Sequence, residues 1–65
     1  MEDNLRKLVK ENTIHEKYKL NNASQLGTQL GLSRNWISQY LNEYYNDGTF
    51  IKINTRPVVF LDREA

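Results

Sequence analysis

The sequence predicts a mainly helical domain of three helices that ends in a small β-hairpin. Three segments before residue 47 carry apolar residues at the i, i+3, i+4 spacing of helices. The C-terminal part instead holds two β-branched and aromatic runs, Phe50–Ile53 and Val58–Leu61, which are typical of strands. We therefore expect a single domain over residues 1–65, with helices at about 3–12, 23–30 and 34–46 and a hairpin at about 50–61.

The first helix is predicted from one apolar stripe, formed by Leu5, Leu8 and Val9. Asp3 is suited to cap its start, because a carboxylate there accepts from free backbone N–H groups and meets the positive end of the helix dipole. Ile14 falls outside the stripe, so the helix is expected to end near Asn12, and the polar residues 13–19 either extend it or form a loop.

The second helix is predicted from its two ends. Asn22 and Gln25 have the spacing of a capping box, in which the Asn side chain accepts from the backbone N–H near Gln25. Gly31 can end the helix in the left-handed conformation that other residues resist. Gly27 costs stability in mid-helix, so its presence indicates that another helix approaches closely there.

The third helix begins after Ser33, a good N-cap, and stops at Asn46-Asp47-Gly48. At 100° per residue, its two faces have different chemistry. The inner face is apolar and aromatic, with Ile37, Tyr40, Leu41 and Tyr44. The outer face is polar, with Arg34, Asn35, Ser38, Gln39 and Asn42.

The hairpin is expected to turn through a four-residue loop, Asn54-Thr55-Arg56-Pro57, which separates the two β-type runs. Pro57 is tolerated at the start of the return strand.

Composition excludes several function classes. The chain has no cysteine, which removes disulfides and cysteine-type zinc sites, and its one histidine, His15, is expected to be an ordinary surface residue. No apolar run approaches the roughly 20 residues of a membrane span, and no apolar signal core follows the N-terminus. We expect a cytoplasmic protein without cofactor or metal. Since no nucleophile–base pair or phosphate-cradling loop is visible, we expect no enzymatic activity.

The outer face of the third helix carries the functional hypothesis, because its side chains suit base recognition in the major groove. Arg34 can pair with guanine, and the amides of Asn35, Gln39 and Asn42 can pair with adenine. Ser38 is small enough to let the helix sit close, and Glu43 lies at the edge. A solvated surface more often carries Glu and Lys, so the alternative, a neutral protein-binding face, is the weaker interpretation.

Other residues are candidates for contacts with the DNA backbone. Ser24 and Gln25 open the second helix, where backbone N–H groups can meet a phosphate. Lys52 and Arg56 are the only basic residues of the hairpin, and Arg56 either reaches a phosphate or the minor groove or is a solvated turn residue. Trp36 either packs under the hairpin or contacts the sugar-phosphate backbone, and we favour partial burial. Tyr45 is exposed near the groove or supports the hairpin.

The sequence resembles bacterial winged helix-turn-helix domains, in particular the N-terminal domain of levanase-regulator-type activators. The resemblance covers about residues 20–63 and rests on Gly-Leu-Ser-Arg-Asn-Trp-Ile-Ser-Gln-Tyr-Leu-Asn and on the Thr-Arg-Pro-Val-Val-Phe of the hairpin. It implies that Ser33, Arg34, Asn35, Ser38 and Gln39 face the DNA groove and that Lys52 and Arg56 belong to the wing. This family often has glycine where Thr55 stands, so Asn54 is expected to take the positive φ of the turn.

The family comprises sigma-54-dependent regulators of phosphotransferase-system sugar operons, with an AAA+ ATPase domain downstream. The resemblance implies double-stranded DNA as the partner and an activator of sugar-uptake genes. The net charge of only +1 predicts weak phosphate attraction, so we expect further domains of the same protein or homo-oligomerisation to add affinity. The alternative is a winged-helix protein–protein interaction module that binds no DNA.

Overall fold

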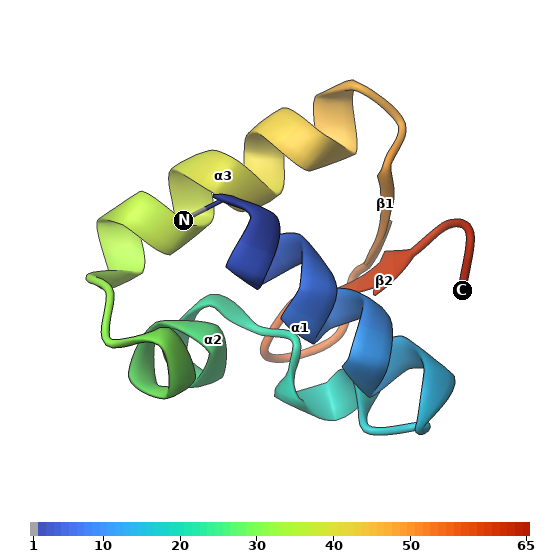
Figure 1. Cartoon of the computed structure of the whole chain (residues 1–65), viewed down its shortest axis with the longest axis horizontal. Coiled ribbons are helices and arrows are strands. Elements are labelled where there is room, and N and C mark those ends of the chain that lie inside the picture. Colours follow the sequence, from blue (N-terminus) through green and yellow to red (C-terminus); the bar gives the residue numbers. More distant parts are fainter. Residues whose placement is uncertain (1) are drawn as a thin grey trace.

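The computed structural model describes residues 2–65, with side chains from Asn4 onward. Figure 1 shows the helices around a common interior and a hairpin that closes one side. The elements are α1 (Glu2–Ile14), a 3₁₀ turn η1 (Tyr18–Leu20), α2 (Ala23–Leu30), α3 (Arg34–Asn46), β1 (Phe50–Ile53) and β2 (Val59–Asp62). This is the architecture of a winged helix-turn-helix domain, and the predicted fold class is confirmed.

Helix α1 is longer than predicted at both ends. It includes Glu2, and the side chain of the predicted cap Asp3 lies outside the described part of the structure. At the other end it continues past Asn12 to Ile14, where Thr13 Oγ1 donates to the Val9 carbonyl at 2.7 Å. Ile14 is exposed, in keeping with its place off the apolar stripe.

Helix α2 has the predicted ends. Asn22 Oδ1 accepts from the backbone N–H of Gln25 at 3.0 Å, and Gly31 ends the helix with a φ of 67°. A Cβ on Gly27 would lie 2.9 Å from the Leu32 carbonyl oxygen and 3.7 Å from Ile37 Cγ1. The glycine therefore permits the close approach of the turn and α3, as its mid-helix position indicated.

Helix α3 also has the predicted bounds. Ser33 Oγ accepts from the backbone N–H of Trp36 at 3.3 Å, and Gly48 follows the helix with a φ of 86°. In the turn to β1, hydrogen bonds from the Thr49 hydroxyl and its backbone N–H, the latter 2.8 Å from Asp47 Oδ1, lower the pKa of the Asp47 carboxyl.

The hairpin is confirmed, but its loop differs from the prediction. Strands β1 and β2 are antiparallel and pair from Phe50↔Asp62 to Ile53↔Val59, which leaves residues 54–58 as a five-residue loop. Pro57 lies in this loop after a cis peptide bond rather than at the start of the return strand. Among the described residues the non-glycine positive φ is at Glu16, so the expectation of a positive φ at Asn54 is wrong.

The core lies where the three helices and the hairpin meet. Its buried apolar side chains are Leu5, Val9, Leu26, Ile37, Leu41, Phe50 and Phe60. Tyr40 and Tyr44 pack against this core as partly buried residues, and the Tyr44 and Phe50 rings lie 4.8 Å apart. The hairpin is thus anchored by one aromatic residue from each strand.

Buried polar side chains join α1 to β2, which the sequence did not predict. Asn21 is fully buried, and its Nδ2 donates to the carbonyls of Val9 at 3.2 Å and Phe60 at 2.9 Å. Asn12 Nδ2 donates to Asn21 Oδ1 at 2.8 Å. At the end of β2, the buried Asp62 has Arg6 Nε 4.0 Å from its Oδ2. These contacts fix the base of the hairpin against the helices.

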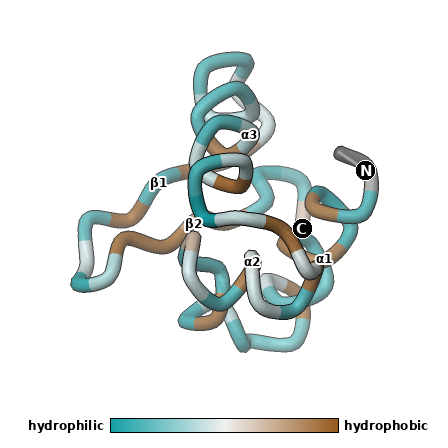
Figure 2. Tube along the Cα trace, turned by 90° about the vertical axis from the view of Figure 1, so that its left-hand side faces the viewer, coloured by the Kyte–Doolittle hydropathy of each residue, from teal (hydrophilic) through white to brown (hydrophobic). Residues whose placement is uncertain are grey.

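Beyond that base, the hairpin extends away from the helical body. Figure 2 shows the loop between β1 and β2 projecting on the side opposite α1, with mostly hydrophilic colouring at its tip.

Candidate nucleic-acid interface

A groove of about 420 Å³ lies between α3, the start of α2 and the hairpin. Both apolar and polar residues line it. The lining residues are Asn22, Ala23, Ser24, Arg34, Ser38, Leu41, Asn42, Lys52, Thr55, Arg56, Pro57, Val58 and Phe60. Residues from the two predicted contact regions, the third helix and the wing, are therefore brought together in one hollow.

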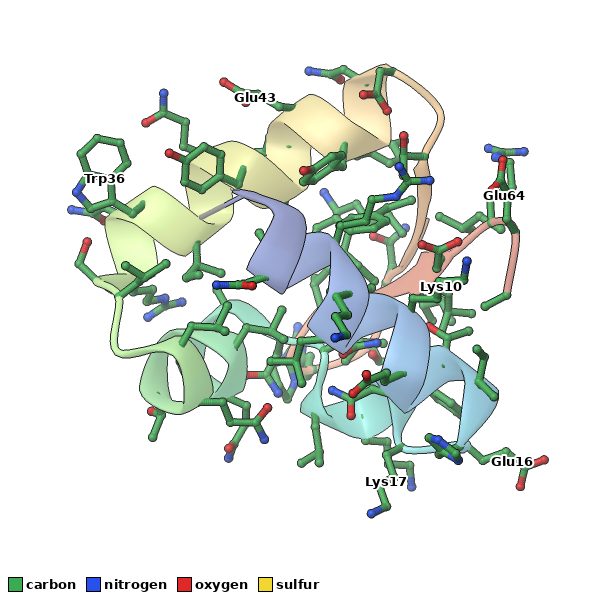
Figure 3. The ribbon with its side chains drawn as sticks, viewed as in Figure 1. Lys10, Glu16, Lys17, Trp36, Glu43 and Glu64 are labelled. Carbon is green, nitrogen blue, oxygen red and sulfur yellow. The ribbon has the colours of Figure 1, made fainter. Side chains whose placement is uncertain are left out.

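The charged residues of the groove all have the same sign. Arg34 comes from α3, Lys52 from β1 and Arg56 from the hairpin loop, and no Asp or Glu is among the described lining residues. Glu43 follows Arg34 by nine positions, which places it on the opposite side of the helix at 100° per residue. Figure 3 shows Glu43 pointing outward from α3. The groove therefore presents a positive surface to a ligand, although the chain is close to neutral.

The amide side chains of α3 flank this groove and are exposed. Asn42 lines the groove itself, while Asn35 and Gln39 lie beyond its edge on the outermost face of the helix. Within the described part of the chain, none of these three amides makes a hydrogen bond or an ion pair. Their donors and acceptors are directed to solvent and are available to a ligand.

Of the two candidate residues at the start of α2, only one lines the groove. Ser24 lines the groove, whereas Gln25 does not, and the backbone N–H of Gln25 is already bonded to the Asn22 side chain. Ser33 is likewise outside the groove lining and caps α3. The structure thus brings Ser24, Arg34, Ser38, Asn42, Lys52 and Arg56 into the groove and leaves Gln25, Ser33, Asn35, Trp36 and Gln39 outside it.

Trp36 is 53% exposed and does not pack under the hairpin. Its ring stacks on Tyr40 with the ring centroids 6.0 Å apart and the planes at 26°. Figure 3 shows the indole at the outer edge of α3, near the start of the helix. The expected partial burial is therefore wrong: the indole is exposed, and the ring it contacts belongs to its own helix.

Tyr45 was left undecided between two roles by the sequence. In the structure it is 46% exposed, and Lys52 Nζ lies 5.7 Å from the centroid of its ring. It follows Arg34, Ser38 and Leu41 along one row of α3, at spacings of four and three residues. That spacing is the signal by which the sequence could have placed Tyr45 on the groove side.

Among the residues that the structure describes, no group of three or more His, Cys, Asp or Glu side chains is placed to hold a metal ion. In the same described range, no helix is long and apolar enough to cross a membrane.

The chain is similar in sequence to the transcriptional regulatory protein DagR of Salmonella typhimurium (strain 14028s / SGSC 2262), with 51% identity over 43 residues. These residues amount to 66% of this chain but only 5% of DagR, so the chain spans a small part of the relative's length. No family model matches the chain, and no solved structure matches it significantly.

Proposed function

We propose that this chain is a sequence-specific domain for double-stranded DNA and that it belongs to a larger bacterial transcriptional regulator. The observation that carries the proposal is the groove in which every charged lining residue is a cation, beside a helix face of exposed amides. Phosphates attract the first feature, and base edges match the second. The similarity to a transcriptional regulatory protein supports the regulatory role.

The proposed contacts fall into two groups, those that recognise bases and those that bind the sugar-phosphate backbone. Helix α3 lies in the major groove, where Arg34 pairs with guanine and Asn35, Gln39 and Asn42 pair with adenine. Ser38 permits close approach of the helix. The remaining candidates, Ser24, Gln25, Ser33, Trp36, Lys52 and Arg56, contact the sugar-phosphate backbone and position the helix.

The larger protein is part of the proposal. Because nearly all of DagR lies outside the aligned segment, further domains are expected to accompany this one, and the resemblance to sigma-54-dependent activators points to an AAA+ ATPase among them. With a net charge of +1, the isolated domain is expected to bind weakly, so linkage to other copies through those domains adds affinity. The genes controlled are proposed to be sugar-uptake genes, and the site of action the bacterial cytoplasm. No catalytic role is assigned to residues 1–65.

The proposal is tested by selecting duplexes that bind the domain from a random library. The dissociation constant is then measured for the selected duplex and for a scrambled duplex of the same composition, at several salt concentrations. We expect a preference of at least about 10-fold for the selected duplex, since several base contacts at about 1–3 kcal/mol each are proposed. Equal affinity for both duplexes contradicts sequence-specific binding.

Amide chemical shifts recorded during the same titration locate the contact. We expect the shifts to concentrate in α3, the start of α2 and residues 52–56. The single tryptophan, Trp36, offers a second signal through its fluorescence. Absence of binding to any duplex, or shifts confined to α1, favours the protein-interaction alternative.

A further inference from the structure

Two successive tyrosines of α3 meet alternate residues of β1. The Tyr44 ring packs against Phe50 at 4.8 Å, and the Tyr45 ring lies under Lys52 Nζ at 5.7 Å. Phe50 and Lys52 are two positions apart on one strand, so their side chains point to the same face. That face is turned toward the C-terminal half of α3.

The two contacts differ in what they contribute to folding. Phe50 is fully buried and belongs to the core, so its contact with Tyr44 holds β1 in place. Tyr45 is 46% exposed, and Lys52 is exposed as well, so their contact buries little area. An aromatic side chain left at the surface under a cation therefore affects the position of the cation more than the stability of the core.

The aromatic contact matters for Lys52 because the lysine side chain is long and flexible. A lysine side chain has four flexible carbon–carbon bonds, and immobilising it on binding costs conformational entropy. A cation held over an aromatic ring before the ligand arrives loses less of that freedom on binding. Lys52 also lines the groove, so the Tyr45 ring restrains the end of a side chain that belongs to the groove wall.

We propose that Tyr45 is a positioning residue of the DNA groove: its ring holds the Lys52 ammonium at the wall formed by α3, where a phosphate is met. This inference rests on the proposed function and adds to it a residue that acts through another residue. It also links the wing to the recognition helix at a point outside the core.

The first test uses the free protein and no DNA. In the wild type, the ring current of Tyr45 is expected to shift the ε-methylene protons of Lys52 upfield in the NMR spectrum, because Lys52 Nζ lies 5.7 Å from the ring centroid. Tyr45→Leu is expected to remove this shift and Tyr45→Phe to retain it, because the phenylalanine ring can still face the ammonium. Unshifted ε-protons in the wild type overturn the proposal.

The second test measures affinity for the selected duplex. Tyr45→Leu is expected to weaken binding about two- to five-fold, the range of an exposed cation–π contact, while Tyr45→Phe binds like the wild type. Tyr18→Leu is the matched control, since Tyr18 is a partly exposed tyrosine of η1 outside the groove, and it is expected to leave affinity unchanged.

A double-mutant cycle with Lys52→Gln separates positioning from direct contact. If Tyr45 acts through Lys52, Tyr45→Leu has no further effect once Lys52 is replaced. Additive losses show that Tyr45 touches DNA itself and overturn the proposal, as does wild-type affinity of Tyr45→Leu. Failure of the wild type to prefer any duplex instead overturns the proposed function, and the two failures are thereby distinguished.

Discussion

Two groups of amide side chains in this small domain have the same chemistry and opposite surroundings. Asn12 on α1 and Asn21 after η1 have buried side chains that bond to each other, and Asn21 also donates to backbone carbonyls of α1 and β2. Asn35, Gln39 and Asn42 lie on the outer side of α3, exposed and, among the described residues, without an internal hydrogen bond. The first group is committed to the fold, whereas the second is free to bind a ligand.

The difference shows that burial, rather than residue type, decides what an amide does. A buried amide whose partners are lost leaves polar groups out of contact with water, which is costly. An exposed amide exchanges water for a ligand at little cost to the fold. Substitutions in the two groups should therefore affect different measurements, stability in one case and binding in the other.

The largest effect is expected for Asn21→Ala. The change removes three side-chain hydrogen bonds and leaves the carbonyls of Val9 and Phe60 without that partner, so the free energy of unfolding should fall by about 3 kcal/mol. Urea unfolding followed by circular dichroism measures the loss. Asn12→Ala, which removes one of these bonds, should lose about 1–2 kcal/mol and still fold.

Asn35→Ala is the matched control on α3, and its stability should change by less than about 0.5 kcal/mol. Equal stability of the Asn21→Ala and Asn35→Ala variants would mean that the buried network does not support the fold.

The next largest effect is expected on the recognition of the DNA sequence. Gln39→Ala should reduce the discrimination between the selected and scrambled duplexes by about 1–3 kcal/mol, because a bidentate contact with one base is lost. Its unfolding free energy should stay near that of the wild type, in contrast with Asn21→Ala. Competition titrations with both duplexes check the prediction, and equal losses on both would contradict base reading by Gln39.

A smaller effect is expected for the wing. Arg56→Ala should weaken binding to all duplexes alike and lower the slope of log affinity against log salt by about 1, since one phosphate contact is lost. Lys10→Ala removes the same charge from an exposed position of α1, outside the groove, and should leave the slope nearly unchanged. Identical slopes for Arg56→Ala and the wild type remove Arg56 from the proposed contacts.

The smallest effect is expected for Asp47, which is hydrogen-bonded like the first group of residues and exposed like the second. Hydrogen bonds from Thr49 stabilise its ionised carboxylate and lower its pKa in the folded protein. The resulting stabilisation is complete above the ordinary pKa of 3.8 and is lost as the pH falls through the lower folded value.

Carbon-detected NMR titration of the Asp47 carboxyl checks this expectation, and the matched measurement on Thr49→Ala should show its pKa moving back toward the ordinary value. A midpoint at or above 3.8 in the wild type would contradict the role of the Thr49 hydrogen bonds. Because the site is exposed, the effect on overall stability should be far smaller than that of Asn21.

The elements that the sequence predicted well are those with local signals. The bounds of α2 and α3 follow from Asn22, Gly31 and Ser33, whose capping bonds join residues three or four positions apart. The end of α1 was predicted less well, because Thr13 bonds to the Val9 carbonyl and to the backbone N–H of Asp62 on β2, a contact over 49 residues.

The features of the candidate site also differ in whether a local sequence signal predicts them. The polar outer face of α3 follows from helical periodicity, so its exposed amides could be predicted. The five-residue loop at Pro57 and the contact of Tyr45 with Lys52 could not, because they depend on the register of β1 with β2 and on the packing of the hairpin against α3.

The sequence by itself determined the order of the helices, their caps and the chemistry of each face, because these depend on neighbours within one or two turns. Only the tertiary structure decided which polar residues became interior and which cations came together. Asn21 is buried because β2, which holds its partner Phe60 39 residues away, packs over it. Arg34 lines the same groove as Lys52 and Arg56 because the hairpin packs beside α3. Such contacts depend on how all the segments pack around one core. The sequence near each residue does not indicate which distant residue it will contact.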